Sequence, residues 1–278
     1  MTSSTLIYAH RGGAGLYPES TLYAYEHVIK MGVDVIDMDI CMSKDQELIV
    51  SHTPYLDPEL TRDAEDHYLS LDKLLIKELT VDDLKRYNVG QIKPGSLREK
   101  ECPQQKSLET ARIPTLKEVI DLAKELTQNT MRYQIEIKYN VAEHRIFTPA
   151  RHLIEATLDF LYKENIVHLT EIQCFDWDVL IQLALLEPSL KTAFLSPSYN
   201  YHFNLSLPQT INHLGGTIWG PDYHTLSEES LLEAKHLGLK IVPWTVNDPD
   251  IMQQLINSEV DGIITDRPDL LRKILKRS

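Results

Sequence analysis

Eight short apolar runs alternate with helix-like segments along the 278 residues of the chain. Alternation of this kind predicts βαβ units and a parallel sheet. Eight such units in a chain of this length predict an α/β fold, a closed (β/α)₈ barrel of the TIM type, which takes about 250 residues. The expected strands are Thr5–Ala9, Val35–Cys41, Arg132–Lys138, Glu171–Phe175, Thr192–Leu195, Thr217–Gly220, Lys240–Val246 and Gly262–Thr265.

Helix-start signals lie between the expected strands. Ser20 is the expected N-cap of the first helix, because a serine side chain can accept from a free backbone N–H there. Thr115 with Glu118, and Thr225 with Glu228, have the spacing of a capping box. These signals support the helical half of the alternation.

Residues 53–113 interrupt the alternation and are too many for a simple strand-to-helix loop. Helical patterns at Leu71–Ile76 and Val81–Tyr87 are followed by a polar segment, Ser96–Arg112. We therefore expect one barrel domain, residues 1–278, with a small insertion after the second strand. Its expected position is the C-terminal rim, where barrel enzymes carry substrate-facing loops.

The charge of the chain restricts its ligands. Lys and Arg number 28 and Asp and Glu number 41, which gives a net charge of −13. An acidic surface repels nucleic-acid phosphates, so no nucleic-acid partner is expected. An anionic ligand would have to be attracted by local cations or by a metal ion.

Cysteine use and hydropathy indicate the compartment. Cys41, Cys102 and Cys174 are odd in number and form no CxxC motif, which favours a reducing environment. The first residues do not have the pattern of a signal peptide, and no apolar run is long enough to span a bilayer. We expect a cytoplasmic protein without stable membrane insertion, whose oligomeric state is unknown.

Two strands are expected to bring carboxylates together. Asp37 and Asp39 alternate along one strand and so share a face, although parallel strands are usually apolar on both faces. Glu136 and Lys138 share a face of the next strand. Three carboxylates on adjacent strands favour Mg²⁺ or Ca²⁺ over Zn²⁺. The alternatives are a solvated pair at a frayed strand end and a buried ion-pair network.

The first strand ends in His10-Arg11-Gly12-Gly13, at the edge where barrel active sites lie. Arg11 can make two parallel contacts to a phosphate. The two glycines would let a ligand approach the backbone closely.

Three further residues are candidates for the same rim. Glu19 follows the first strand, although a carboxylate there can also serve only to start the helix. His52 ends an apolar run, so that it and His10 could serve as general acid and general base. Trp244 ends a late strand and is either an apolar wall for a substrate or a core residue.

The stretch AHRGGAGLYPESTLYAYEHVIKMGVDVIDMDI resembles the opening of glycerophosphodiester phosphodiesterases, which show HRG, PEN-T, G-D-IE-D and V-HD in this order. The family belongs to the phospholipase C-like phosphodiesterases with a TIM barrel. The similarity extends over essentially the whole chain, through LTVDDLKRYNVG, IPTLKEVI, QIEIK, GLKIVPWTVND and DGIITDRPDLL.

The resemblance implies a TIM barrel with a small insertion, one divalent metal ion (Mg²⁺ or Ca²⁺, with Mn²⁺ possible), and hydrolysis of small glycerophosphodiesters to an alcohol and sn-glycerol 3-phosphate. It implies the following roles, carried over by position: acid/base catalysis by His10 and His52, phosphate and glycerol binding by Arg11, Lys138 and Trp244, and metal binding by Glu19, Asp37, Asp39 and Glu136.

Three positions depart from the family pattern. Asp37 stands where the family usually has Glu, Ser20 where it has Asn, and Thr53 where it has Asp. Asp37 is one methylene shorter, which bears on the metal, whereas serine caps a helix about as well as asparagine. These changes leave the expected fold intact and bear on the preferred metal and substrate.

Other functions remain open. Related barrels act on lysophospholipids or sphingomyelin as phospholipases D, or on phosphoinositides as phospholipases C. Such an enzyme should show an apolar or basic rim on the insertion, but Ser96–Arg112 has few large apolar residues, which favours a soluble substrate. A non-catalytic phosphodiester-binding protein would be expected to lack a histidine or a metal carboxylate.

Overall fold

The computed structural model describes residues 5–70, 73–198 and 205–277. The strands are β1 (Leu6–Ala9), β2 (Val35–Met42), β3 (Leu48–Val50), β4 (Arg132–Ile137), β5 (Thr170–Cys174), β6 (Lys191–Ser196), β7 (Ile218–Pro221), β8 (Lys240–Ile241) and β9 (Gly262–Thr265). The helices are α1 (Leu22–Met31), α2 (Val81–Leu84), α3 (Leu97–Glu101), α4 (Leu116–Thr127), α5 (Ala150–Glu164), α6 (Trp177–Leu186), α7 (Leu207–His213), α8 (Glu228–His236), α9 (Pro249–Asn257) and α10 (Pro268–Ile274).

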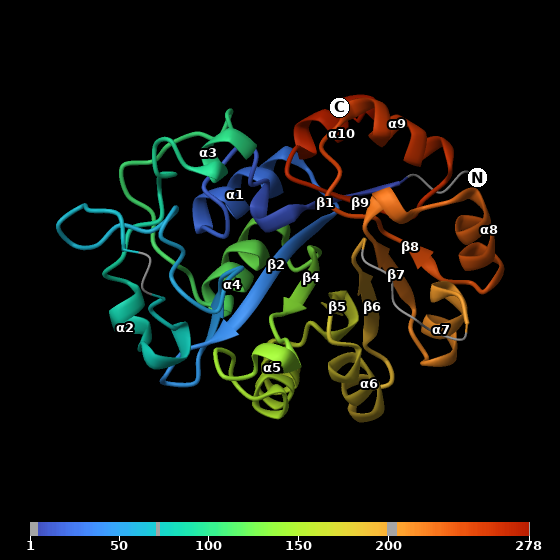
Figure 1. Ribbon diagram of the computed structural model, residues 1–278, viewed down its shortest axis with the longest axis horizontal. Coiled ribbons are helices and arrows are strands. Elements are labelled where there is room, and N and C mark those ends of the chain that lie inside the picture. The colour runs from blue at the N-terminus through green and yellow to red at the C-terminus, as the bar shows by residue number, and fades with distance from the viewer. Residues whose placement is uncertain (1–4, 71–72, 199–204, 278) are drawn as a thin grey trace.

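The parallel strands form the wall of a barrel, with the longer helices around its outside (Figure 1). Their order is β8-β7-β6-β5-β4-β2-β1-β9. Backbone hydrogen bonds close the barrel between the two ends of this series, including Asp261 N to Ile241 O at 2.9 Å and Val246 N to Ile264 O at 3.0 Å. The predicted TIM barrel is confirmed.

Along β2, alternation separates an outward apolar face from an inward face that changes from apolar to polar. On β2, Ile36, Met38 and Ile40 face outward and belong to the large core under the helices. Val35 faces inward and belongs to the small apolar centre of the barrel. Further along the same inward face come Asp37 and Asp39, each 3% exposed. The polar layer therefore lies toward the C-terminal ends of the strands.

The strands differ from the prediction at two places. The first is β3, a strand that was not predicted and that pairs antiparallel with β2. Ser51 N then donates to Asp39 O at 3.0 Å, which holds the chain beside β2 just before His52. β8 ends at Ile241 instead of Val246, because Pro243 has no N–H to continue the ladder.

The helix caps agree with the sequence in part. Thr115 and Glu118 form the predicted capping box. Ser20 is not the cap of α1, because Thr21 takes that position. The predicted pair Thr225 and Glu228 is also wrong.

The cap of α8 shifts by two residues. Thr225 lies in a 3₁₀ turn, Tyr223–Thr225, and its hydroxyl donates to Asp222 O. Ser227 and Ser230 form the capping box in its place. The 3₁₀ turn keeps the backbone of Thr225 from the extended conformation that an N-cap needs.

The insertion, residues 53–113, packs on the rim around a small apolar core that it shares with β2 and β3. The predicted helix Leu71–Ile76 is wrong in its described part, since a 3₁₀ turn starts only at Ile76, and Leu71 lies outside the described residues. The predicted helix Val81–Tyr87 is shortened to α2, and α3 was not predicted. The core consists of Cys41, Ile49, Leu56, Ile76, Leu84 and Ile113.

Two expectations about the whole chain can be compared with the described residues. The three cysteines are buried and form no disulfide there. Within the same residues, every helix is too short or too polar to cross a bilayer.

We expect Thr115→Ala to lower the free energy of unfolding by about 1 kcal/mol, because it removes the side-chain acceptor at the start of α4. Urea denaturation at equilibrium measures the change. Thr115→Ser keeps the hydroxyl and should stay close to wild type. An equal loss in both variants would assign the effect to the methyl group of Thr115 and not to the cap.

Candidate active site

The turn after β1 has an unusual backbone. Arg11, Gly12 and Gly13 have φ values of 50°, 79° and 78°, in the left-handed region. A Cβ on Gly12 would lie 2.8 Å from the Cβ of Ala24 in α1. The glycines therefore allow the tight packing of this turn against α1, and the expected approach of a ligand to this backbone stays a prediction.

Arg11 connects the turn to the carboxylate layer. Its Nη1 donates to Glu19 Oε1 at 3.1 Å, and its Nε lies 3.3 Å from Asp39 Oδ2. Burial alone would lower the pKa of Arg11, but Glu19 and Asp39 outweigh it and raise the pKa above its ordinary value. Arg11 is therefore a fixed positive charge at the barrel mouth.

Lys138 has a similar position on the next strand. Its Nζ lies 2.6 Å from Glu136 Oε1 and 3.6 Å from Asp39 Oδ1. Burial would lower the pKa of Lys138, but Glu136 and Asp39 raise it above its ordinary value. Burial would raise the pKa of Asp39, but Lys138 and Arg11 hold it below its usual range.

The negative charges of Asp37 and Glu136 are less well balanced by nearby cations. Burial, followed by the charges of Asp39 and Glu136, raises the pKa of Asp37 well above its ordinary value. Gln173 Nε2 donates to Asp37 Oδ1 at 2.8 Å. Burial also raises the pKa of Glu136, which reaches about 7 although Lys138 opposes the rise. The layer thus has more carboxylates than cations.

His10 is held by a residue that the sequence did not identify. Its Nδ1 lies 2.6 Å from Asp266 Oδ1, just after β9. Asn247 Nδ2 donates to the other oxygen of Asp266 at 2.7 Å. Burial would raise the pKa of Asp266, but His10 and Asn247 hold it at about 2. An ionised carboxylate can only accept, so Nδ1 carries a proton and Nε2 is the other nitrogen of the ring.

His52 has a different environment. Burial, followed by the charge of Arg11, lowers its pKa to about 2, so that the ring is neutral in the working range of pH. Thr53, which replaces the usual Asp, donates from its hydroxyl to Tyr55 O at 2.6 Å and so closes its own turn. Thr53 therefore brings no negative charge to the vicinity of His52.

A cavity of about 120 Å³ lies at the mouth of the barrel. Trp244 forms part of its wall, with Nε1 donating to Gly220 O at 2.8 Å and its ring edge-on to Phe175 at 5.3 Å. Trp244 is only half-buried, so it is a cavity wall as well as a core contact. The lining includes His10, Arg11, Asp37, His52, Glu136, Lys138, Gln173, Phe175 and Trp244.

The fit of a divalent cation can be judged from the donors. The four candidate carboxylates are buried and offer hard oxygen ligands, and the three cations that contact them, Arg11, Arg98 and Lys138, do not fully balance them. Across the described residues, no three His, Cys, Asp or Glu side chains are already arranged as a ready set of ligands. Arg11 and Lys138 contact these carboxylates, so a cation could bind only after the oxygen atoms turn toward it.

Comparison with known proteins identifies the family. The sequence model of the glycerophosphoryl diester phosphodiesterase family matches residues 10–270. The chain belongs to this family. Its enzymatic class is therefore that of the phosphoric diester hydrolases.

Relatives match along almost their whole length. A Bacillus subtilis glycerophosphodiester phosphodiesterase is 30% identical, over 98% of this chain and 86% of the relative. A Silicibacter pomeroyi structure assigned to the same family has a TM-score of 0.93 at 28% identity, covering 99% of this chain and 94% of that one. An Oleispira antarctica phosphodiesterase in complex with the product sn-glycerol-3-phosphate has a TM-score of 0.77 at 20% identity, covering 98% and 97%.

The structure brings together the predicted residues of this phosphodiesterase family member. The cavity is lined by seven of them: His10, Arg11, Asp37, His52, Glu136, Lys138 and Trp244. The other two, Glu19 and Asp39, contact Arg11. Their individual roles stay predictions.

Asp266, Asn247 and Gln173 also belong to this arrangement and were missed. Asp266 follows the last strand, so its place at a C-terminal strand end was a usable signal. Asn247 directly follows the expected strand Lys240–Val246 and so had the same signal, whereas Gln173 lies inside a strand and had none.

The pair of Asp266 and His10 predicts a pH dependence of stability. A carboxyl with a pKa of about 2 against an ordinary 3.8 stabilises the fold above pH 3.8, and loses this effect as the pH falls through 2. We expect Asp266→Asn to cost about 2 kcal/mol at pH 5 and about 1 kcal/mol at pH 3. Urea denaturation at each pH measures the difference.

Asp82 is exposed on the insertion, so Asp82→Asn is a matched control that should change little at either pH. A cost of Asp266→Asn that stays constant between pH 5 and pH 3 would contradict the assigned ion pair.

Proposed function

We propose that this enzyme hydrolyses glycerophosphodiesters to an alcohol and sn-glycerol 3-phosphate by histidine acid/base catalysis with a bound divalent cation. The observation that carries the proposal is that two histidines and two cationic side chains, Arg11 and Lys138, line one cavity at the C-terminal end of the barrel. The Oleispira phosphodiesterase in complex with sn-glycerol-3-phosphate supports this product class.

The histidines differ in a way that suits opposite roles. His52 is kept neutral by burial and by Arg11, so it can accept the proton of the attacking oxygen. His10 has Nδ1 against the carboxylate of Asp266, which fixes the orientation of the ring, so that in this proposal Nε2 delivers the proton to the leaving alkoxide. In this proposal Asp266 is a positioning residue for His10.

The phosphoryl group would lie between Arg11 and Lys138. Both side chains stay charged, and a planar guanidinium can donate to two phosphate oxygens at once. Because both also contact carboxylates, phosphate competes for donors that are already held in place. Their charge would stabilise the additional negative charge of the transition state.

We propose Glu19, Asp37, Asp39 and Glu136 as the residues that hold the cation. The excess of buried carboxylates over buried cations supports this, as do the raised pKa values of Asp37 and Glu136. When bound, a divalent cation supplies electrostatic stabilisation of the phosphoryl oxygens and a template for the substrate. Mg²⁺, Ca²⁺ and Mn²⁺ are the candidates.

The attacking oxygen is either water or the neighbouring hydroxyl of the glycerol moiety. The second route gives a transient cyclic phosphate before hydrolysis. Trp244 and Phe175 form the apolar wall against which the glycerol carbons would pack. Following the appearance of cyclic phosphate and glycerol 3-phosphate with time distinguishes the two routes.

A soluble substrate is favoured over a lipid. Among the described residues of the insertion, Leu74 and Leu97 are the large apolar side chains that are exposed. They do not form the apolar rim expected of an enzyme that acts on lysophospholipids or sphingomyelin. A release of choline from lysophosphatidylcholine as fast as from glycerophosphocholine would reverse this assignment.

We expect His10→Ala and His52→Ala each to lower kcat for glycerophosphocholine by about 10² to 10⁴-fold, since each removes one proton-transfer group. A coupled assay for glycerol 3-phosphate measures the rates, and circular dichroism checks that the fold survives. His236→Ala, on the exposed end of α8, serves as the matched control. Near-wild-type turnover in either cavity variant would disprove the acid/base assignment, whereas a wild-type protein that binds the diester without turnover would favour a non-catalytic binding protein.

Removal of divalent cations should abolish turnover. We expect EDTA to inactivate the enzyme, and Mg²⁺, Ca²⁺ or Mn²⁺ to restore activity after the chelator is dialysed away. Asp37→Asn should raise the metal concentration needed for half-maximal activity, because it removes one hard anionic ligand. Full activity after exhaustive chelation would contradict the metal proposal.

A further inference from the structure

The chain after β8 closes the barrel next to His10. Because β8 ends at Ile241, the residues that follow it make separate contacts with β9. Ile264 N donates to Pro243 O, and Val246 N donates to Ile264 O, each at 3.0 Å. The next contacts along the chain come from the side chain of Asn247 and reach the residues that end β9 and follow it.

The side-chain amide of Asn247 is used on both of its polar atoms. Its Oδ1 accepts from Thr265 Oγ1 at 3.1 Å and from Asp266 N at 2.9 Å. Its Nδ2 donates to Asp266 Oδ2 at 2.7 Å. Asp266 presents a backbone donor and a carboxylate acceptor, and a primary amide offers the matching acceptor and donor in one plane. Asn247 is exposed, so these hydrogen bonds, and not packing, hold its side chain.

Both carboxylate oxygens of Asp266 are therefore held. Its Oδ1 lies 2.6 Å from His10 Nδ1, and its Oδ2 accepts from Asn247. The last torsion of an Asp side chain is broad, so a carboxylate with a single partner can turn. The N–H from Asn247 restricts this rotation. The amide is fixed in turn by Thr265, which is fully buried and whose Oγ1 also accepts from Arg267 N at 2.9 Å.

We propose that Asn247 is a positioning residue for the general acid, which by holding Asp266 keeps the ring of His10 turned with Nε2 toward the leaving oxygen. This inference rests on the proposed function, in which His10 delivers the proton to the leaving alkoxide. A hydrogen-bonded series from His10 through Asp266 and Asn247 to Thr265 then connects the cavity with the buried wall of the barrel. Asn247 lies outside the cavity lining, so it acts through Asp266.

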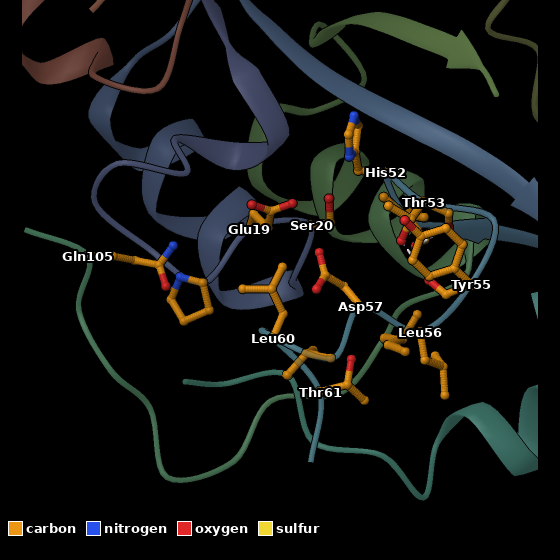
Figure 2. A pocket seen from close by; sticks show the side chains of 15 residues that line it. Glu19, Ser20, His52, Thr53, Tyr55, Leu56, Asp57, Leu60, Thr61 and Gln105 are labelled. Carbon is orange, nitrogen blue, oxygen red and sulfur yellow. Dashed lines mark hydrogen bonds between the residues drawn. The ribbon is translucent and has the colours of Figure 1, made fainter. Parts of the chain in front are cut away.

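His52 is held independently of this series. Figure 2 shows its ring pointing away from Asp57 of the insertion. Burial, followed by the charge of Arg11, lowers the pKa of His52 and keeps the ring neutral. A change at Asn247 leaves these groups in place. It should therefore affect the proton that His10 gives to the leaving oxygen, and not the attacking side of the reaction.

Two substrates separate proton delivery from barrel closure. Glycerophosphocholine releases an alkoxide that needs a proton, whereas the p-nitrophenyl ester of sn-glycerol 3-phosphate releases a phenolate that leaves without one. Asn247→Asp keeps the acceptor for Thr265 Oγ1 and Asp266 N, but sets a carboxylate against that of Asp266.

We expect Asn247→Asp to lower kcat for glycerophosphocholine about tenfold, a part of the about 10²- to 10⁴-fold that a general acid contributes. With the divalent cation present, kcat for the nitrophenyl ester should stay within about twofold of wild type. Asn247→Ala removes all contacts of the amide and should show the same selective loss. Asn257→Ala, at the exposed end of α9, is the matched control and should keep the wild-type kcat on both substrates.

A wild-type kcat for glycerophosphocholine in Asn247→Asp would overturn the proposal. An equal loss on both substrates in the two Asn247 variants would also overturn it, and would assign Asn247 to barrel closure alone. An equal loss on both substrates in His10→Ala would instead contradict the proposed role of His10.

A spectroscopic test does not depend on turnover. The nitrogen chemical shift of His10 Nδ1, assigned by its loss in His10→Gln, reports whether this nitrogen carries a proton. At about pH 9 we expect Nδ1 to be protonated in wild type and partly unprotonated in Asn247→Ala, because a carboxylate that can turn no longer holds the N–H. An unchanged signal in Asn247→Ala would overturn the proposal. The expected change in a protein that hydrolyses no diester would support the positioning of His10 and disprove the proposed function.

Discussion

The contacts of Arg11 and Lys138 with buried carboxylates are the interactions on which the barrel mouth depends. Arg11 bridges Glu19 to Asp39, and Lys138 bridges Asp39 to Glu136. Removing one partner of such a buried pair typically costs about 3 to 5 kcal/mol, because the other charge is left without compensation. The same two cations are the proposed phosphate ligands. A single set of contacts therefore serves stability and, in our proposal, substrate binding.

The period of two along the strands explains why this charged layer is tolerated. Outward side chains form the main core with the helices, and inward ones form an apolar centre. The inward positions toward the C-terminal ends, such as Asp37 and Asp39, are polar, and Glu171 near the other end of the barrel is held by Tyr8 and Arg132. Asp37 and Asp39 are therefore buried at the end of the barrel that opens to solvent. The antiparallel strand β3 then leads the chain back over this layer, just before His52.

The sequence predicts the features that depend on local periodicity. Strand alternation identified the barrel and the shared faces of Asp37 with Asp39 and of Glu136 with Lys138. It did not identify Asp266, because its contact with His10 joins residues 256 positions apart. Cap positions were less predictable where several hydroxyl side chains compete, as around Ser20. The insertion was predicted as a segment but not in its helices, since its small apolar core has no regular repeat.

The neighbouring positions of β1 and β9 have a consequence for biosynthesis. Among the strands of the barrel β1 is made first, and it pairs with β9, which is made last. Until β9 leaves the ribosome, one edge of β1 has no partner strand and His10 has no carboxylate to orient it. In our proposal, a growing or truncated chain that lacks β9 would therefore have no catalytic activity, however much of the barrel had formed. The onset of turnover would report that the ring of strands has closed, a step that joins the most distant parts of the chain and is expected to be slow.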